Sequence, residues 1–396
     1  MATLFISYKY PPSLGGMQKQ SYELIQGYSK ERQAHALIHD QKGSVLFFFV
    51  SLLWRVPLLL RRQPDISTIH FNDGVCALCC IWMRLYWSMS LVVTYHGLDL
   101  VFPNVIYQKL LLPLLHSLDA VIAVSLATKE ACVERGFDPD RIIVVPNGVD
   151  AEVIIDEEAV HPQAVAEISN LQADNKKIIT AIGRPVKRKG FVWFVEEVLP
   201  QLDPSYLFVL IGPYPEMAEK QERWLRLLPK GLRRQVELCF GLSTEHELLR
   251  RAASLPEYKD RFLWYQNLNH DSKNWVLEAS TAFVMPNVKV PGDMEGFGLV
   301  ALEANMLNTP VIAARLEGIT TAVTHGKNGL LLESEDAASW IEVLNDFSAS
   351  SLSYSCKYYA KQNYSWTTMV QGYGRAFDHI LKQKQGHEKS TSRVFF

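Results

Sequence analysis

The amino-acid sequence predicts an α/β protein with two doubly wound domains, each a mainly parallel sheet covered by helices. The chain has 396 residues, which is long for one core. Short apolar segments alternate with helix-length segments along it, and a polar, acidic stretch at 156–174 separates two such series. We expect a first domain at 1–165, a second at 166–375, and the end of a terminal helix with a tail at 376–396. The tail from Lys382 onward is not expected to be ordered.

The first series of strands begins at the start of the chain. Leu4–Ser7 is a short apolar segment, and Pro11–Gly16 is predicted to form a loop before a helix over Met17–Ser29. Pro146–Asp150 ends the series with turn-forming residues. Further strands of this domain are expected at 66–71, 91–94, 120–124 and 142–145.

The second series restarts beyond the acidic stretch. In doubly wound sheets, ligands bind outside the carboxyl ends of the strands, so functional side chains are expected in the loops that follow strands. Two such edges that face each other across a cleft would suit an extended ligand. The strands of the second domain are expected at 177–182, 207–211, 261–265, 282–285, 311–313 and 330–332.

Composition and charge exclude some classes of protein. The 48% hydrophobic and 21% charged fractions are typical of a globular protein, and a formal net charge of −2 provides no field that would attract nucleic acid. Six cysteines are few for this length, and the N-terminus lacks the pattern of a secretory signal. We therefore expect a reducing, cytoplasmic location and no nucleic-acid partner.

Residues 45–60 form the most hydrophobic segment of the chain. Arg55 and Pro57 interrupt it, and it is shorter than the roughly 20 residues that span a bilayer. From residue 41 to residue 63 there are four basic side chains and no acidic one. Two interpretations stay open. One is an interfacial helix that touches anionic lipid at the inner face of the cytoplasmic membrane; the other is a core helix with a solvated basic end.

The segment Glu295–Glu303 (EGFGLVALE) carries two carboxylates, one in a glycine-containing loop and one inside the following apolar helix. Gly296 and Gly298 allow the backbone to approach a ligand closely. The amides at the helix start, from about Phe297 to Val300, lack intrahelical partners and attract hydroxyl or phosphate oxygens. The two carboxylates could accept hydrogen bonds from vicinal diols, which suits a ligand with a sugar at one end and a ribose near the other. The alternative is an ordinary loop-to-helix cap.

The loop Gly183–Gly190 follows the first strand of the second domain and contains four cations among eight residues. Arg184 could bind a phosphate through two parallel hydrogen bonds, and Lys189 could supply a point charge. These charges would neutralise a phosphate without a metal ion. A solvated basic turn is the alternative interpretation.

Three features of the first domain complete the set of candidates. Gly15 and Gly16 offer bare backbone amides, but their loop is not G-x-G-x-x-G, so the dinucleotide fingerprint is absent there. His96 ends a strand and could hydrogen-bond a substrate hydroxyl, or it could be structural. The D-x-D sequence at 138–140 has the form of a metal-binding pair, but nothing nearby in sequence adds oxygen ligands at suitable spacing, so no metal site is expected.

Together these motifs resemble the retaining, nucleotide-sugar-dependent glycosyltransferases of family 4, which have the two-domain GT-B fold. The resemblance covers nearly the whole chain and follows the family's order. It implies that the first domain binds the acceptor and the second binds the nucleotide sugar. It implies that Tyr364-Ser365-Trp366 precedes a final helix that crosses back to the first domain. The matching segments are Gly15-Gly16, Tyr95–Gly97, Val124-Ser125 with Lys129, Pro146–Asp150, Gly183-Arg184 with Lys189-Gly190, Glu295–Glu303 and Asn328–Leu330.

The resemblance also implies roles for individual residues. The catalytic residues would be Glu295, His96, Arg184 and Lys189. The loop Arg315–Thr320 departs from the family's usual sequence, which leaves the contacts to the far side of the diphosphate unassigned. Donor-binding residues would be Gly15, Gly16, Arg184, Lys189, Glu295, Gly296, Phe297, Gly298, Leu299 and Glu303, with Asn267 and Leu268 expected near the donor base.

The implied reaction is transfer of a hexose from a nucleoside diphosphate sugar, such as a UDP- or GDP-sugar, to a hydroxyl of a glycan or lipid-linked acceptor. The anomeric configuration would be kept, and no cofactor or metal would be required. Cell-surface polysaccharide or lipopolysaccharide synthesis is the expected context. The alternatives are another GT-B sugar-nucleotide enzyme, such as an epimerase or phosphorylase, and a non-catalytic partner in a glycan-assembly complex.

Overall fold

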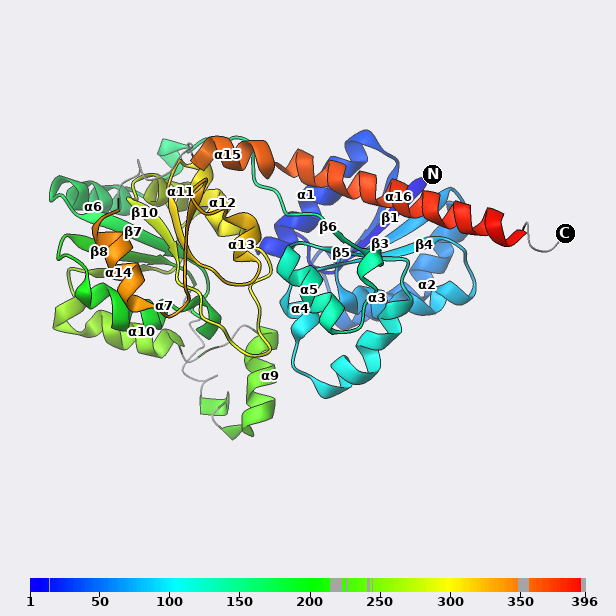
Figure 1. Cartoon of the computed structure of the whole chain (residues 1–396), viewed down its shortest axis with the longest axis horizontal. Coiled ribbons are helices and arrows are strands. Elements are labelled where there is room, and N and C mark those ends of the chain that lie inside the picture. Colours follow the sequence, from blue (N-terminus) through cyan, green and yellow to red (C-terminus); the bar gives the residue numbers. More distant parts are fainter. Residues whose placement is uncertain are drawn as a thin grey trace. The chain divides into compact units, whose positions relative to one another are not determined.

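The computed structural model describes two compact α/β units (Figure 1). One comprises Met1–Gly148 and Tyr364–Phe396, and the other comprises Val149–Asn363. Each contains a six-stranded parallel sheet, which confirms the prediction of two doubly wound domains. The residues described are 1–13, 15–213, 223–225, 227–240, 243, 245–347 and 356–392.

The limits of these units differ from the domain limits expected from the sequence. The backbone amide of His161 donates to the Ser272 hydroxyl at 2.9 Å, and Ile168 is buried in the core of the second unit. The acidic stretch therefore packs as part of that unit. At the other end, Arg32 binds Asp378 at 2.6 Å, so residues beyond Tyr364 belong to the first unit.

The sheet of the first unit has the strand order β2-β1-β3-β4-β5-β6. Strand β2 was not predicted. It is an edge strand with a mostly half-buried sequence, AHALI, which lacks the continuous apolar run of the central strands. The order reverses between β1 and β3, which is where doubly wound sheets bind ligands. The strands are β1 (Ala2–Ser7), β2 (Ala34–Ile38), β3 (Ile66–Phe71), β4 (Ser90–Tyr95), β5 (Ala120–Ala123) and β6 (Ile142–Val144).

Side-chain caps fix the starts of two helices in this unit. Asp73 accepts a hydrogen bond from the Cys76 amide, and Ser125 accepts one from the Thr128 amide. The helices are α1 (Gly16–Glu31), α2 (Val45–Arg62), α3 (Gly74–Cys80), α4 (Leu98–Val101), α5 (Leu126–Glu134) and α16 (Trp366–Ser392), with the short helices η1 (Ile81–Leu85), η2 (Tyr107–Leu111), η3 (Leu112–Ser117) and η4 (Pro139–Arg141).

Helix α16 packs along α1 and continues to Ser392. The expectation that the chain is disordered from Lys382 is therefore wrong up to this point. Residues 383–392 are polar apart from one glycine and include no proline, and the Lys384 ammonium donates to the Met89 carbonyl at 2.8 Å. This contact ties the helix to the start of β4.

The sheet of the second unit has the order β12-β11-β10-β7-β8-β9, and all six of its strands were predicted to within about two residues. The order reverses between β7 and β10. One face of the sheet packs on a cluster that includes Phe194, Phe208 and Trp340. The strands are β7 (Lys177–Ile182), β8 (Tyr206–Ile211), β9 (Phe262–Tyr265), β10 (Ala282–Met285), β11 (Val311–Ala314) and β12 (Gly329–Leu332).

The helices of the second unit cover both faces of its sheet, because alternate strand residues pack into different helix-lined core clusters. They are α6 (Pro162–Ala173), α7 (Phe191–Trp193), α9 (Lys230–Phe240), α10 (Glu245–Ser254), α11 (His270–Glu278), α12 (Leu299–Met306), α13 (Ile319–Ala322), α14 (Ala337–Asn345) and α15 (Cys356–Asn363), with the short helices η5 (Glu157–Ala159), η6 (Lys187–Lys189), η7 (Phe194–Val198), η8 (Leu199–Gln201) and η9 (Pro256–Tyr258). Among the residues described, no helix has the length and apolarity to span a membrane.

Candidate functional site

The carboxyl edge of the second sheet gathers most of the residues singled out from the sequence. The loop Gly183–Gly190 follows β7, and the segment that leads to Glu295 follows β10. These are the two strands between which the strand order reverses. Because their carboxyl ends lie side by side, the fold places the basic loop next to the acidic segment at the position where doubly wound sheets bind ligands.

Gly190 is what allows the basic loop to approach the β10 segment. It has a left-handed backbone with a φ of 65°, and a Cβ atom there would lie 1.8 Å from the Pro286 carbonyl oxygen. The Val288 amide donates to the Arg188 carbonyl at 3.0 Å, which joins the two loops by their backbones. Lys189 is thereby directed at the residues that follow β10.

Lys189 and Glu295 form a salt bridge of 2.7 Å between Nζ and Oε2, and their side chains are only 11% and 13% exposed. Asn287 Nδ2 also donates to Glu295 Oε2, at 3.3 Å. Burial alone would raise the pKa of Glu295, but the charges of Lys189 and Arg188 outweigh it and lower the pKa to about 2. Glu295 is thus an ionised, acceptor-only carboxylate at neutral pH.

Arg188 and Arg184 add two further cations to this cluster. Arg188 Nε lies 3.6 Å from Glu295 Oε2 and 3.7 Å from Asp293 Oδ1. Arg184 is exposed and feels the negative charges of Asp293 and Glu295, but it forms no salt bridge or side-chain hydrogen bond with the part of the chain that the structure describes. Its guanidinium group therefore keeps its donors available for a ligand.

Glu317 is a member of the site that the sequence analysis did not identify. Its Oε2 accepts a hydrogen bond from the Glu295 amide at 2.6 Å, and the Gly318 amide donates to the Glu295 carbonyl at 3.0 Å. A Cβ atom on Gly318 would lie 2.0 Å from the Gly296 carbonyl oxygen. The loop after β11, which departs from the family pattern, thus holds the backbone of Glu295 from both sides. The sequence could have indicated Glu317 as a site residue, because it lies in a loop directly after a predicted parallel strand.

The pKa of Glu317 is raised to about 7, mainly by burial and further by the charges of Glu295 and Asp293. The Glu317 carboxyl therefore keeps its proton in the folded state at pH values where the same carboxyl in the unfolded chain, with its ordinary pKa, has already lost it. From that value up to about pH 7, the unfolded state binds fewer protons, so the free energy of unfolding falls as the pH rises.

Replacing Glu317 with glutamine is expected to remove this part of the pH dependence. The glutamine oxygen can still accept from the Glu295 amide, but it does not titrate. Urea unfolding between pH 5 and pH 7 should show a shallower decline in stability for the variant than for the wild type. Equal slopes in the two proteins would contradict the assignment.

Glu303 lies in α12, the helix that directly follows the Glu295 segment. Gly298, with a φ of 94°, precedes α12, and Glu303 on this helix binds Lys273 Nζ at 2.7 Å. Lys273 belongs to α11, directly after the loop that contains Asn267 and Leu268. Asn267 is exposed, whereas Leu268 packs partly against the core. Lys273 is thus a second residue that the sequence analysis missed.

The other expected residues of the Glu295 segment, Gly296, Phe297 and Leu299, differ in what they can present to a ligand. The Phe297 side chain is 3% exposed and belongs to the core, so only its backbone can face a ligand. Gly296 is buried against Gly318, and Leu299 is the first residue of α12. The structure therefore brings Arg184, Lys189 and Glu295 into one cluster and places the start of α12 immediately after it in the chain.

Gly15, Gly16 and His96 belong to the first unit, at the carboxyl edge of its sheet. Gly15 has a φ of 150° and precedes α1, which begins at Gly16. His96 Nε2 donates to the Asn72 carbonyl at 3.0 Å, and burial lowers the pKa of His96 to about 4. The imidazole is therefore neutral and fixed, with Nδ1 carrying its lone pair.

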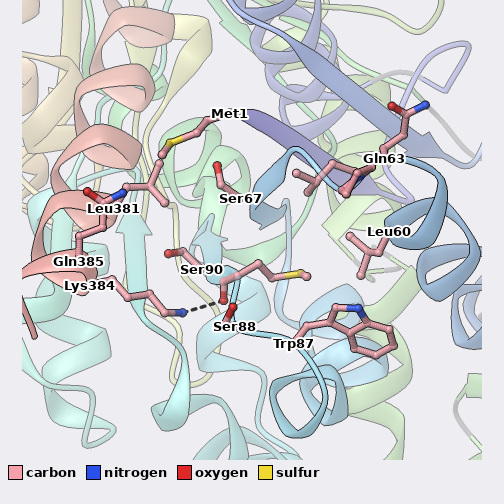
Figure 2. A pocket seen from close by; sticks show the side chains of 13 residues that line it. Met1, Leu60, Gln63, Ser67, Trp87, Ser88, Ser90, Leu381, Lys384 and Gln385 are labelled. Atoms are coloured by element: carbon pink, nitrogen blue, oxygen red, sulfur yellow. Dashed lines mark hydrogen bonds between the residues drawn. The ribbon is translucent and has the colours of Figure 1, made fainter. Parts of the chain in front are cut away.

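A pocket of about 460 Å³ lies at the opposite, amino edge of the first sheet (Figure 2). It is formed where β3 and β4 begin, at Ile66 and Ser90, together with the end of α2 and the segment of α16 from Leu381 to Gln385. Figure 2 shows Lys384 among the residues that line this pocket, and its ammonium group donates to the Met89 carbonyl at 2.8 Å. None of the expected site residues lines it, so it is separate from the carboxyl edge of the sheet.

Comparison with known proteins identifies the family. Residues 166–366 match the model for glycosyl transferases group 1, and residues 15–153 match the model for glycosyltransferase family 4. The chain is 29% identical over 268 residues to the D-inositol 3-phosphate glycosyltransferase of Mycolicibacterium vanbaalenii, covering 65% of this chain and 53% of that protein. It is also 29% identical over 217 residues to an alpha-maltose-1-phosphate synthase of Mycolicibacterium smegmatis, covering 54% and 48%. The chain spans about half the length of these curated relatives.

Solved structures show the same fold. Anabaena Alr3699/HepE in complex with UDP-glucose matches with a TM-score of 0.65 at 18% identity, over 97% of this chain and all of that one. Sucrose-phosphate synthase from Thermosynechococcus elongatus matches with a TM-score of 0.67 at 20% identity, over 96% and 99%. With two six-stranded parallel sheets and matches to both family models, this chain belongs to the glycosyl transferases group 1 family and has the GT-B fold of two Rossmann-like domains.

Proposed function

We propose that this protein is a retaining glycosyltransferase that moves a hexose from a UDP- or GDP-sugar to a hydroxyl of a glycan or lipid-linked acceptor. The observation that carries the proposal is the cluster after β7 and β10: an exposed Arg184 beside the buried pair of Lys189 and Glu295. The named neighbours support a sugar-nucleotide donor, because the Anabaena protein is described in complexes with UDP and with UDP-glucose.

Charge at the cluster favours an anionic ligand. Three cations, Arg184, Arg188 and Lys189, stand against two carboxylates, Asp293 and Glu295, which leaves one excess positive charge while Glu317 is protonated. Lys189 and Arg188 already have carboxylate partners, so Arg184 would make the principal contact with the donor diphosphate. A planar guanidinium group can bind two phosphate oxygens at once.

Glu295 is suited to hold the transferred sugar. A carboxylate with a pKa of about 2 accepts hydrogen bonds and does not act as an acid at neutral pH, so it would orient sugar hydroxyls. Glu303 would accept hydrogen bonds from the ribose, sharing its charge with Lys273. Asn267 and Leu268 would lie near the donor base, and Gly15 and Gly16 near the diphosphate.

The chemical step would depend on stabilising the leaving group. The bond between the anomeric carbon and the diphosphate oxygen breaks, its electron pair stays on the diphosphate, and the acceptor oxygen bonds to the same face of the anomeric carbon. The acceptor proton passes to the departing phosphate oxygen. Arg184 and Lys189 would offset the developing charge in place of a metal ion, and the neutral His96 would help to orient the sugar.

Replacing Arg184 with alanine is expected to lower kcat/KM by about tenfold to a hundredfold, because a charge-assisted hydrogen bond contributes roughly 1.5 to 3 kcal/mol. Lys187 provides a matched control, since it is an exposed cation in the same loop. Lys187→Ala should keep near-normal activity. A fully active, folded Arg184→Ala protein would contradict the phosphate-binding role.

The donor can be identified by thermal shift, because only a ligand that binds the folded state raises the Tm. UDP-, GDP- and ADP-sugars should be compared, and the one that stabilises the protein should then release nucleoside diphosphate only when an acceptor is present. Release without an acceptor, or with free phosphate alone, would instead indicate an epimerase or a phosphorylase.

Two further measurements address the mechanism. Activity that persists with a chelator would support metal-independent transfer, and the anomeric signal of the product in NMR would report whether the configuration is kept. A glycosyl adduct trapped on any side chain would contradict same-face transfer and indicate a double displacement.

The expected setting is synthesis of cell-surface polysaccharide or lipopolysaccharide at the inner face of the cytoplasmic membrane. The acid-free, apolar α2 supports such a setting, because an enzyme that modifies lipid-linked glycans benefits from a surface that holds it at the bilayer.

A further inference from the structure

Helix α2 is apolar on two opposite sides. Its buried residues are Phe48, Ser51, Leu52, Val56 and Leu60, which pack into the first unit. A surface helix normally presents polar residues on its other face. Here the other face carries six large apolar side chains, which we name the α2 stripe: Leu46 (71% exposed), Phe47 (64%), Val50 (46%), Leu53 (50%), Trp54 (49%) and Leu58 (46%).

The spacing of the α2 stripe shows that it is one continuous surface. Its members recur at intervals of three or four residues, which places them along one side of a helix. Phe47 and Trp54, two turns apart, are in edge-to-face contact with ring centroids 6.1 Å apart. The core requires only the buried side of α2, so packing within the unit does not account for the stripe.

The charged residues of segment 41–63, which contains the α2 stripe, are all basic. Lys42, Arg55, Arg61 and Arg62 are exposed, and no acidic residue other than Asp40 and Asp65, which lie outside it, occurs near this segment in the sequence. The whole chain has a net charge of −2, so this helix is a local basic region on a slightly acidic protein. A partner for this surface should be both apolar and anionic.

A second exposed apolar segment lies close to the first. Residues 102–117 contain no acidic side chain, and Lys109 among them is exposed. Helix α3 contacts both α2 and η3, and its Val75 is 40% exposed. The apolar side chains of this segment are Val105 (67% exposed), Ile106 (60%), Leu110 (64%), Leu111 (38%) and Leu114 (52%).

The start of α2 adjoins the edge of the sheet where an acceptor is expected. Phe49 packs on Tyr8, with ring centroids 5.2 Å apart, and Tyr8 lies in the loop that follows β1 and leads to Gly15. Phe48 packs on His39, which follows β2. A planar surface bound to the α2 stripe would therefore lie beside the carboxyl edge of the first sheet.

We propose that the α2 stripe, extended by residues 105–114, docks on an anionic phospholipid bilayer, and that the acceptor reaches the carboxyl edge of the first sheet from that bilayer. The second half of this statement rests on the proposed glycosyl transfer, whereas the docking does not. A second copy of the chain fits this surface less well, because a two-fold contact through the stripe would bring the four bases of each copy against those of the other.

The docking is tested by co-sedimentation of the full chain with vesicles of equal parts phosphatidylcholine and phosphatidylglycerol. The wild type should bind these vesicles more tightly than pure phosphatidylcholine vesicles, and added salt should weaken the binding. The triple variant L46S/F47S/W54S should bind about a hundredfold more weakly, because three side chains lose their insertion into the bilayer. Ile154→Ser is the matched control: Ile154 is 83% exposed in the second unit, and its loss should change nothing.

A charge variant separates the electrostatic part of the binding. R61Q/R62Q should weaken binding to the anionic vesicles by about 25-fold at low salt and leave binding to pure phosphatidylcholine unchanged. All variants should keep the Tm increase caused by the sugar-nucleotide donor, since none of these residues belongs to the donor site. That increase shows that each variant is folded.

Three outcomes would overturn the docking: a wild type that does not bind anionic vesicles, a triple variant that binds them like the wild type, or a wild-type dimer in light scattering that the triple variant converts to a monomer without any vesicle binding. The two proposals fail separately. Vesicle binding without any transfer to an acceptor would support the docking and contradict the glycosyl transfer. Transfer to an acceptor without vesicle binding would support the glycosyl transfer and contradict the docking.

Discussion

Replacing Lys189 with methionine is expected to destabilise the second unit by about 3 kcal/mol, at the lower end of the range for breaking a buried ion pair. The substitution leaves the ionised Glu295, which is 13% exposed, without its 2.7 Å partner. Arg188 and Asn287 stay close to this carboxylate, which is why the loss should not reach the upper end of the range. The same change should abolish donor-induced stabilisation, because a cation of the phosphate site is removed.

The double variant K189M/E295Q separates the two effects of this substitution. It removes the buried charge together with its partner, so urea unfolding should show recovery of much of the lost stability. Donor binding should stay absent. If the double variant is as unstable as K189M, the ion pair is not the source of the loss. Lys187→Met, a change of the same type at an exposed position, is the control for both measurements.

Replacing Gly190 with alanine is expected to have the other large effect, a loss of more than about 3 kcal/mol in the free energy of unfolding. An alanine Cβ would lie 1.8 Å from the Pro286 carbonyl oxygen and 3.1 Å from Val288, in addition to the unfavourable φ of 65°. The loops after β7 and β10 would have to separate. Lys189 and Glu295 would then part, so the thermal shift with the donor should disappear as well.

Gly326→Ala is the matched control for this substitution. Gly326 has a φ of 73°, but a Cβ atom there has no neighbour within 4 Å. Its loss should therefore amount only to the backbone preference, about 1 to 2 kcal/mol. Urea unfolding of both variants measures the difference. If the two substitutions destabilise equally, contact with Pro286 is not the reason that glycine stands at position 190.

The strands show which elements of the fold can be predicted from local sequence patterns. All strands of the second unit and five of the six in the first were predicted, because strands buried on both faces are continuous apolar runs bounded by turn residues. Strand β2 (Ala34–Ile38) was missed, since an edge strand is buried less and its sequence is less distinctive. The predicted end of helix α16 was too early, because polar residues at a chain end suggest disorder. Packing on α1 and the hydrogen bond from Lys384 to the Met89 carbonyl stabilise the longer helix.

The candidate site likewise contains some residues that were predicted from the sequence and others that only the structure shows. Arg184, Lys189 and Glu295 were selected from the sequence because charged residues beside glycines in loops that follow strands are typical of ligand sites in parallel sheets. Glu303 was selected as the second carboxylate of the Glu295 segment, inside the helix that follows this loop. Glu317 and Lys273 were not selected, although one binds the Glu295 backbone and the other binds Glu303. Glu317 lies beside Gly318 in the loop after β11, but this loop departs from the family pattern, and Lys273 belongs to no motif that the sequence shows. Their roles depend on which elements the fold places side by side.

Periodicity and contiguous motifs are sufficient to predict the architecture, the family resemblance and the residue types that could bind a sugar nucleotide. The charges that meet in the site become apparent only in the folded chain. Lys189 is paired with Glu295 across more than a hundred residues, Arg184 keeps its donors available, and α2 presents one apolar face to the core and another to solvent. Pairing and burial depend on distances across the fold, and a one-dimensional pattern does not contain these distances.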